Sequence, residues 1–197
     1  MKTVTNNKFN KISPIAFLTC FVMNQPVIAN EQSNIDDLAK ACITCHGQKG
    51  ISTDTTFPNL AGQKQGYLNQ EIKAFRDGKR DNPQMLPFVN SLSDDDITQL
   101  AHYFSQQKND AKASETYNKK GENVRARCIS CHGMKGITVT ELWPNLAGQQ
   151  AKYLQKQLHA FKSGKRQSPI MQVIAQELTD EQIEAVAEYY SQQAASQ

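Results

Sequence analysis

The chain has no apolar run long enough to cross a membrane. A spanning helix needs about 20 consecutive apolar residues, whereas only 39% of these 197 residues are hydrophobic and 8% are aromatic. The longest apolar stretch, residues 12–23, is short and is interrupted by Pro14. A polytopic membrane protein is therefore excluded.

The chain also lacks a strong excess of charge. The formal net charge is +3, and segment 1–29 accounts for all of it, because it carries Lys2, Lys8 and Lys11 and no acidic residue. The rest of the chain is neutral overall. Nucleic-acid binding depends on a basic surface, so we expect no nucleic acid as a partner.

Segment 1–29 has the layout of a secretory signal peptide. Its lysines precede a short apolar region, and small or permissive residues precede a cut after Ala29. We predict that the mature chain starts at Asn30 and works in the periplasm. Two alternatives are a retained membrane anchor and a lipoprotein lipidated on Cys20, for which Thr19 is a poor match to the small residue expected before that cysteine.

Cysteines are few and regularly placed. One of the five, Cys20, lies in the signal segment. The others form two Cys-x-x-Cys-His motifs, namely Cys42, Cys45 and His46, then Cys128, Cys131 and His132. This motif is the attachment signature of c-type haem. Positions i, i+3 and i+4 share one helix face, so two thiols can bond the vinyl groups of one porphyrin while the imidazole reaches its iron. We predict two covalent haem c groups, with both histidines as axial ligands.

Three other roles compete for these cysteines. A structural zinc site uses four cysteines but does not require a histidine after each pair. A thioredoxin-like dithiol needs a βαβ context, which the sequence lacks. Two structural disulfides suit an exported chain, but a bridge between Cys42 and Cys45 closes a very tight loop and leaves the histidines unexplained.

The sequence is a tandem repeat. A shift of 86 residues overlays Leu38–Gln107 on Val124–Gln193 without a gap, and the stretch Pro-Asn-Leu-Ala-Gly-Gln occurs at 58–63 and again at 144–149. The joint near residues 108–112 is polar and short. We therefore expect two domains of the same fold that pack face to face.

The fold class predicted for both repeats is all-α, with a few helices wrapped around one haem in each domain. In the first repeat, a helix is expected to open at Asn34 and run to His46, a second to cover Gln65–Arg76, and a third to start at Ser93. The predicted boundaries are a signal peptide over 1–29, domain 1 over 30–108 and domain 2 over 109–197.

Two methionines are candidates for the second axial position. Met85 and Met171 occupy matching places in the repeats, each two residues after a proline in a loop. His102 and His159 are not equivalent, so we expect them to be surface or structural residues. Histidine–methionine ligation raises the reduction potential and fills the coordination sphere. Such an iron passes single electrons, so we predict an electron-transfer protein without catalytic residues.

The mature chain resembles the di-haem cytochromes c of the cytochrome c4 family. Each repeat has C-x-x-C-H, P-N-L-A-G-Q, Gly-Lys-Arg, P-x-M and a last helix that opens with acidic residues. The resemblance implies a periplasmic carrier, soluble or peripherally associated with the membrane, that takes electrons from a quinol-oxidising bc complex toward a haem–copper terminal oxidase. It also implies that the carbonyls of Pro58 and Pro144 accept the Nδ1–H of the ligand histidines, although both prolines also suit a plain turn.

Further alternatives remain at this point. The pairs Lys79–Arg80 and Lys165–Arg166 either neutralise haem propionates, bond across the domain interface or are simply solvated, and solvation is the favoured reading. Tyr67 and Tyr153 either pack against the porphyrin, bond a propionate or serve core packing alone, and core packing is the favoured reading. Rival functions are an electron-entry subunit of a larger dehydrogenase or oxidase and a di-haem peroxidase, which needs an open iron.

Overall fold

The computed structural model describes residues 1–3, 28–111, 114 and 118–195. Most of the predicted signal peptide, including Cys20, lies outside these residues. Across the described ranges, no helix is long and apolar enough to span a bilayer.

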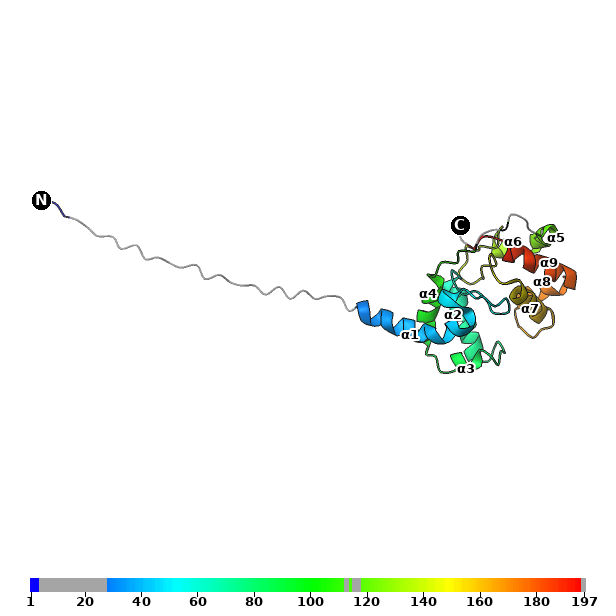
Figure 1. Cartoon of the computed structure of the whole chain (residues 1–197), viewed down its shortest axis with the longest axis horizontal. Coiled ribbons are helices and arrows are strands. Elements are labelled where there is room, and N and C mark those ends of the chain that lie inside the picture. The colour runs from blue at the N-terminus through cyan, green and yellow to red at the C-terminus, as the bar shows by residue number, and fades with distance from the viewer. Residues whose placement is uncertain (4–27, 112–113, 115–117, 196–197) are drawn as a thin grey trace.

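Helices, turns and loops make up the described part of the chain, in which no strand occurs, as the all-α prediction requires. Figure 1 shows α1–α4 gathered in one half of the molecule and α5–α9 in the other. The α-helices are α1 Ile28–His46, α2 Gln65–Arg76, α3 Leu86–Val89, α4 Asp94–Ser105, α5 Lys119–Val124, α6 Ile129–His132, α7 Ala151–Lys162, α8 Pro169–Gln176 and α9 Asp180–Ser191, with 3-10 turns η1 Gln48–Gly50 and η2 Arg125–Arg127.

The last helix of each half begins with a capping box. In α4 the Ser93 side chain accepts the Asp96 N–H and the Asp96 carboxylate accepts the Ser93 N–H; Thr179 and Gln182 do the same in α9. These reciprocal bonds satisfy two of the backbone groups that a helix start leaves unpaired. Each helix then buries an apolar stripe against the middle helix of its half, α4 against α2 and α9 against α7.

The predicted start of the first helix is wrong. Helix α1 begins at Ile28, before the expected cap at Asn34, which therefore lies inside the helix. The residues between them include Ala, Glu and Gln and neither Gly nor Pro, so nothing in their helix propensity stops the helix from starting early. The helix ends as predicted: Gly47, with φ +77°, follows His46, and a Cβ there would lie 1.8 Å from the Ile51 carbonyl oxygen.

The joint between the halves packs against the second half instead of standing free in solvent. Asn109 is buried. The Ala195 N–H donates to the Ala111 carbonyl at 3.0 Å, and the Ser114 N–H donates to the Gln192 carbonyl at 2.9 Å. The chain after α9 therefore holds the described part of the joint in place.

Candidate haem-binding sites

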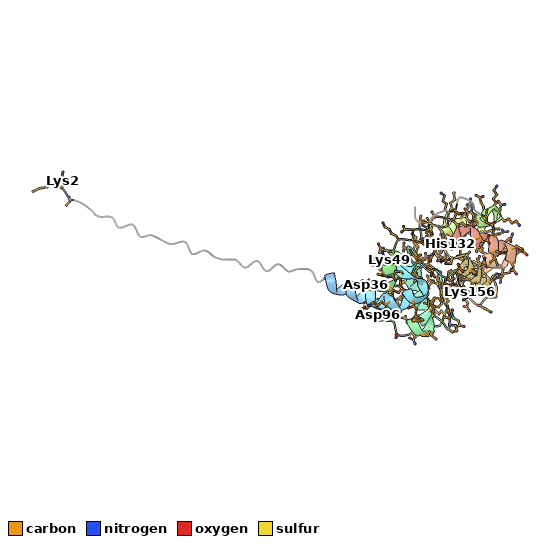
Figure 2. All side chains as sticks on the ribbon, in the orientation of Figure 1. Lys2, Asp36, Lys49, Asp96, His132 and Lys156 are labelled. Carbon is orange, nitrogen blue, oxygen red and sulfur yellow. The ribbon has the colours of Figure 1, made fainter. Side chains whose placement is uncertain are left out.

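A cavity of about 630 Å³ joins the two halves of the molecule. All eight side chains predicted to attach or ligate haem line it: Cys42, Cys45, His46, Met85, Cys128, Cys131, His132 and Met171. Its wall is mostly apolar and includes leucine and phenylalanine side chains from both halves. The structure thus brings together residues that lie far apart in the sequence. The second predicted histidine, His132, is labelled among the helices of its half in Figure 2.

Each candidate ligand histidine is buried and fixed by one hydrogen bond. The His46 Nδ1–H donates to the Pro58 carbonyl at 2.9 Å, and the His132 Nδ1–H donates to the Pro144 carbonyl, also at 2.9 Å. Burial lowers the pKa of both imidazoles below the usual value, and the carbonyl bonds offset only part of this. Both rings are therefore neutral, with Nδ1 protonated and Nε2 available to bind a metal, as haem ligation requires.

The four described cysteines are free thiols. Burial, with a smaller contribution from Cys45, raises the pKa of the Cys42 thiol to about 11, and burial likewise raises the pKa of Cys128. Neutral buried thiols are poorly reactive. Within the described ranges, no three His, Cys, Asp or Glu side chains lie close enough to share a metal ion, so the four-cysteine zinc alternative has no support.

The two methionine segments differ although both methionines line the cavity. Met85 directly precedes the single turn α3, which contains Pro87 at its start. The prediction that Met171 lies in a loop is wrong: it lies inside the first turn of the longer helix α8, whose start is capped by Ser168. In the first half Asn82 stands at the place of Ser168, and its side-chain Oδ1 accepts the Gln84 N–H at 3.0 Å. This bond forms a local turn and does not cap a helix.

The residues of the cavity suit a haem group. Thioether sulfur and imidazole nitrogen on one apolar cavity are the donor set of low-spin c-type haem iron, and two thiols stand beside each histidine for covalent attachment. His102 and His159 are exposed, away from this cavity: His102 lies 3.2 Å from Gln65 Oε1 and His159 lies 3.9 Å from Asp180. The expectation that they are surface residues agrees with these positions.

A ring of four side chains, Glu71, Arg80, Gln157 and Arg166, lines the cavity where the domains meet. Both oxygens of the Glu71 carboxylate are used, one accepting from Arg80 and the other lying 3.0 Å from Arg166. On the opposite side, Gln157 Oε1 accepts from Arg80 at 2.7 Å and from Arg166 at 2.8 Å. The favoured reading of these arginines as solvated is wrong: their side chains are only 11% and 10% exposed. Their neighbours Lys79 and Lys165 are exposed as expected.

Tyrosine and phenylalanine rings complete the surroundings of the arginines. Arg80 donates to the Tyr153 hydroxyl at 3.1 Å, and Arg166 donates to the Tyr67 hydroxyl at 2.9 Å. Each tyrosine thus bonds to the arginine of the other domain, a role beyond the core packing that we favoured. Each guanidinium also stacks on a phenylalanine of its own domain, at 4.4 Å for Phe75 and 4.5 Å for Phe161.

The repeated Pro-Asn-Leu-Ala-Gly-Gln stretch forms a second set of contacts between domains. The Asn59 N–H donates to Gln149 Oε1 at 2.7 Å, and Gln149 Nε2 donates back to the Asn59 carbonyl at 2.9 Å. The matching bonds run from the Asn145 N–H to Gln63 Oε1 at 2.7 Å and from Gln63 Nε2 to the Asn145 carbonyl at 3.0 Å. The domains therefore meet through equivalent contacts, which confirms the face-to-face packing.

Sequence reasoning missed these asparagines and glutamines as interface residues. It also gave no role to Glu71 and Gln157. The available signal was the perfect repetition of six residues. Each residue of such a stretch must suit both its own domain and the matching stretch of the other domain, which limits the residue types it can have.

Comparisons with known proteins place these sites in context. The cytochrome c family matches residues 36–108 and 118–193. The thiosulfate dehydrogenase electron acceptor of Stutzerimonas stutzeri is 34% identical over 177 residues, which cover 81% of this chain and 82% of that protein. Cytochrome c4 of Pseudomonas aeruginosa is 35% identical over 166 residues, which cover 77% of this chain and 83% of the relative. The crystal structure of reduced recombinant cytochrome c4 from Pseudomonas stutzeri has a TM-score of 0.76 at 30% identity and covers 82% of this chain and 97% of that one.

Proposed function

Since this chain belongs to the cytochrome c family and is a di-haem protein of the cytochrome c4 type, we propose that it carries electrons from a quinol-oxidising bc complex toward a haem–copper terminal oxidase. It is an electron-transfer protein with two covalently bound haem c groups. Each group, when bound, supplies a one-electron ferric–ferrous couple. The observation that carries the proposal is the single cavity lined by both sets of ligands.

The residue assignments follow the same cavity. Cys42 and Cys45 would attach one haem, which His46 and Met85 would ligate. Cys128 and Cys131 would attach the other, which His132 and Met171 would ligate. The proline carbonyls hold the histidine rings in one orientation and raise the electron density on the metal-binding nitrogen. The methionines would supply the second ligand to each iron and would keep small molecules off it.

The buried arginines contribute charge to the same cavity. Arg80 and Arg166 share one carboxylate, that of Glu71, so the ring carries one excess positive charge. Buried charge needs compensation, and haem propionates, which are carboxylates, are the natural counter-charges. This proposal joins two of the roles that the sequence left open for the arginines, because the same side chains also bond across the interface.

A second donor is favoured by one comparison. A relative that covers most of this chain is a thiosulfate dehydrogenase electron acceptor. We therefore propose a dehydrogenase of that class as an alternative source of electrons, which corresponds to the electron-entry role weighed above.

The proposed compartment is the periplasm, with the chain cut after Ala29 and with domains over 30–108 and 109–197. Mass spectrometry of the exported protein tests this directly. The expected mass is that of a chain beginning at Asn30 with two haems attached. An N-terminus at Met1 would contradict the cut, and fewer than two haems would contradict the assignments.

Rapid-mixing kinetics test the electron route. The oxidised protein is mixed with purified bc complex and quinol, or with thiosulfate dehydrogenase and thiosulfate, and haem reduction is followed by absorbance. The reduced protein is then mixed with a haem–copper oxidase. Reduction by the bc complex and rapid oxidation by the oxidase are expected. Reduction only by the dehydrogenase would select the second donor, and no oxidation by the oxidase would overturn the proposed route.

A further inference from the structure

One peptide group in domain 1 links its ligand histidine to domain 2. The Pro58 carbonyl accepts the His46 Nδ1–H at 2.9 Å. The N–H of the same peptide group belongs to Asn59 and donates to Gln149 Oε1, on the other domain, at 2.7 Å. The peptide Pro58–Asn59 therefore stands between the imidazole of one domain and the amide of the other.

Domain 2 repeats this arrangement in the opposite direction. The Pro144 carbonyl accepts the His132 Nδ1–H at 2.9 Å, and the N–H of that peptide, on Asn145, donates to Gln63 Oε1 of domain 1 at 2.7 Å. Gln63 and Gln149 are only 7% and 6% exposed. Both chains of hydrogen bonds are thus shielded from bulk water. Hydrogen bonds are stronger in such a low-dielectric interior than in water.

A peptide group transmits polarisation because its C–N bond is partly double. When the N–H donates to a good acceptor, electron density shifts toward the carbonyl oxygen, which then accepts more strongly; successive bonds reinforce one another by roughly 10–30%. A stronger acceptor on Nδ1–H makes the imidazole a more basic ligand. A more basic ligand favours the ferric state and lowers the reduction potential of its haem.

We propose that Gln63 and Gln149 are positioning residues that tune the haem of the opposite domain: Gln149 acts on the haem held by His46, and Gln63 acts on the haem held by His132. The inference rests on the histidine assignments proposed above. Its consequence is that docking of the domains sets both reduction potentials, each through one side chain contributed by the partner domain.

The test is a crossed effect on two separately resolved potentials. Gln149→Leu removes the amide while keeping the side-chain volume, and the potential of the domain 1 haem is expected to rise. We expect about a twofold change in its equilibrium constant for reduction, equivalent to about 18 mV at ~59 mV per tenfold for one electron. The domain 2 haem is expected to change less. Gln63→Leu is expected to give the reverse pattern.

Gln150→Leu is the matched control. Gln150 Nε2 donates across the same interface to the Ser52 carbonyl at 2.8 Å and lies 3.4 Å from the side-chain Oδ1 of Asn59, so it crosses the interface without bonding to the N–H or the carbonyl of the peptide Pro58–Asn59. Its loss removes a hydrogen bond from the same interface and is expected to leave the domain 1 potential within the error of the measurement.

Nuclear magnetic resonance of the reduced, diamagnetic protein gives a readout that does not depend on redox titration. The Nδ1–H proton of His46 is expected to move upfield in Gln149→Leu, because its hydrogen bond weakens, while that of His132 stays in place. A purely structural role would move both protons or neither. Equal shifts of both potentials, or a Gln150→Leu variant that behaves like Gln149→Leu, would overturn the inference.

Failure of this inference is distinct from failure of the proposed function. If the variants keep the methionine-to-iron absorption band of a low-spin haem but show no crossed effect, the inference is wrong and the carrier role stands. If the unmodified protein lacks that band in both domains, the ligand assignment itself is wrong.

Discussion

The two domains hold their candidate ligand histidines alike but build the scaffold around them differently. Each histidine donates to its proline carbonyl at 2.9 Å. The helix that leads to His46 is the 19-residue α1, whereas in domain 2 the six-residue α5, a 3-10 turn and the four-residue α6 lead to His132. The repeat has therefore kept the geometry of the site while the supporting elements have diverged.

One position explains part of the difference between the first helices. Gly121 of α5 packs so closely on α9 that a Cβ would lie 2.0 Å from the Ala185 carbonyl oxygen. The residue at the same place in the repeat is Ile35 of α1, which packs against the core of domain 1. The crossing in domain 2 depends on the absence of a side chain, and the crossing in domain 1 is filled by one.

The domains also differ by a single buried charge. Glu71 of α2 and Gln157 of α7 occupy equivalent places and both contact the two interface arginines. Only one of them is charged, so the otherwise symmetric interface is electrically asymmetric. Four experiments challenge or sharpen this comparison.

Substitution of the methionines has the largest expected effect. Met85→Ala and Met171→Ala each remove a proposed thioether ligand, and each is expected to lower the potential of its own haem by about 0.2 V, a fraction of the ~0.8 V range that axial ligands span. Cyanide is expected to bind the opened iron. Spectroelectrochemical titration measures both haems in each variant. If neither variant changed potential or spectrum, the ligand assignment would be wrong.

Exchanging Glu71 and Gln157 tests the buried charge. Glu71→Gln leaves two arginines without their carboxylate and is expected to destabilise the protein by about 3 kcal/mol, since breaking a buried ion pair costs roughly 3–5 kcal/mol. The double variant with Gln157→Glu moves the charge to the other domain and is expected to recover most of this loss. Denaturant unfolding of the haem-loaded protein measures both. If the double variant were as unstable as the single one, a carboxylate at position 157 would not replace the one at position 71, and the two places in the ring would not be equivalent.

Alanine at the close helix crossing should affect one domain only. Gly121→Ala forces α5 away from α9 and is expected to cost about 2 kcal/mol, within the usual range of ~1–3 kcal/mol for overpacking. Neither Gly66→Ala nor Gly78→Ala is a suitable comparison, because a Cβ on Gly66 would meet Glu141 of the other domain and Gly78 has φ +68°, where alanine is strained. Lys120→Ala, at an exposed position of the same helix α5, is the control for alanine in this helix. Hydrogen exchange of α9 amides locates the effect. An equal loss of amide protection in both domains would contradict the prediction that Gly121→Ala affects domain 2 alone.

The smallest expected effect concerns backbone strain at Lys49. Lys49 (Figure 2) has φ +56°, a left-handed conformation that costs a non-glycine residue about 1 kcal/mol, whereas its repeat equivalent Lys135 is not among the residues with positive φ. Lys49→Gly is therefore expected to stabilise the protein by about 0.5 kcal/mol, and Lys135→Gly is expected to destabilise it slightly through chain entropy. Thermal unfolding measures the melting temperature of both variants. Equal shifts in the two would show that Lys49 is no more strained than Lys135.

The sequence predicts the local features of this fold well. Periodic apolar positions and capping residues locate α2, α4 and α9, and the repeat predicts two copies of one architecture. These features depend on residues that are near one another in the chain, where helical spacing leaves a direct pattern. The start of α1 was wrong because a possible cap at Asn34 does not by itself stop a helix from extending.

The contacts between domains were harder to foresee. Asn59 and Gln149 meet across the interface although 90 positions separate them, and no periodicity links such distant residues. The arginines were misjudged for the same reason, because a charged pair after a helix is usually solvated. Only the three-dimensional arrangement places Glu71 between them.

The amide contacts described above are self-complementary, since each half offers the other the same two kinds of side chain in the same roles. Such isologous surfaces belong to homodimers. Here the two matching surfaces belong to one chain, so the joint segment keeps them close together and their docking is intramolecular. Because the two halves are encoded separately within one chain, a substitution in one half leaves the other unchanged, and Glu71 opposite Gln157 is a difference that two identical subunits could not have.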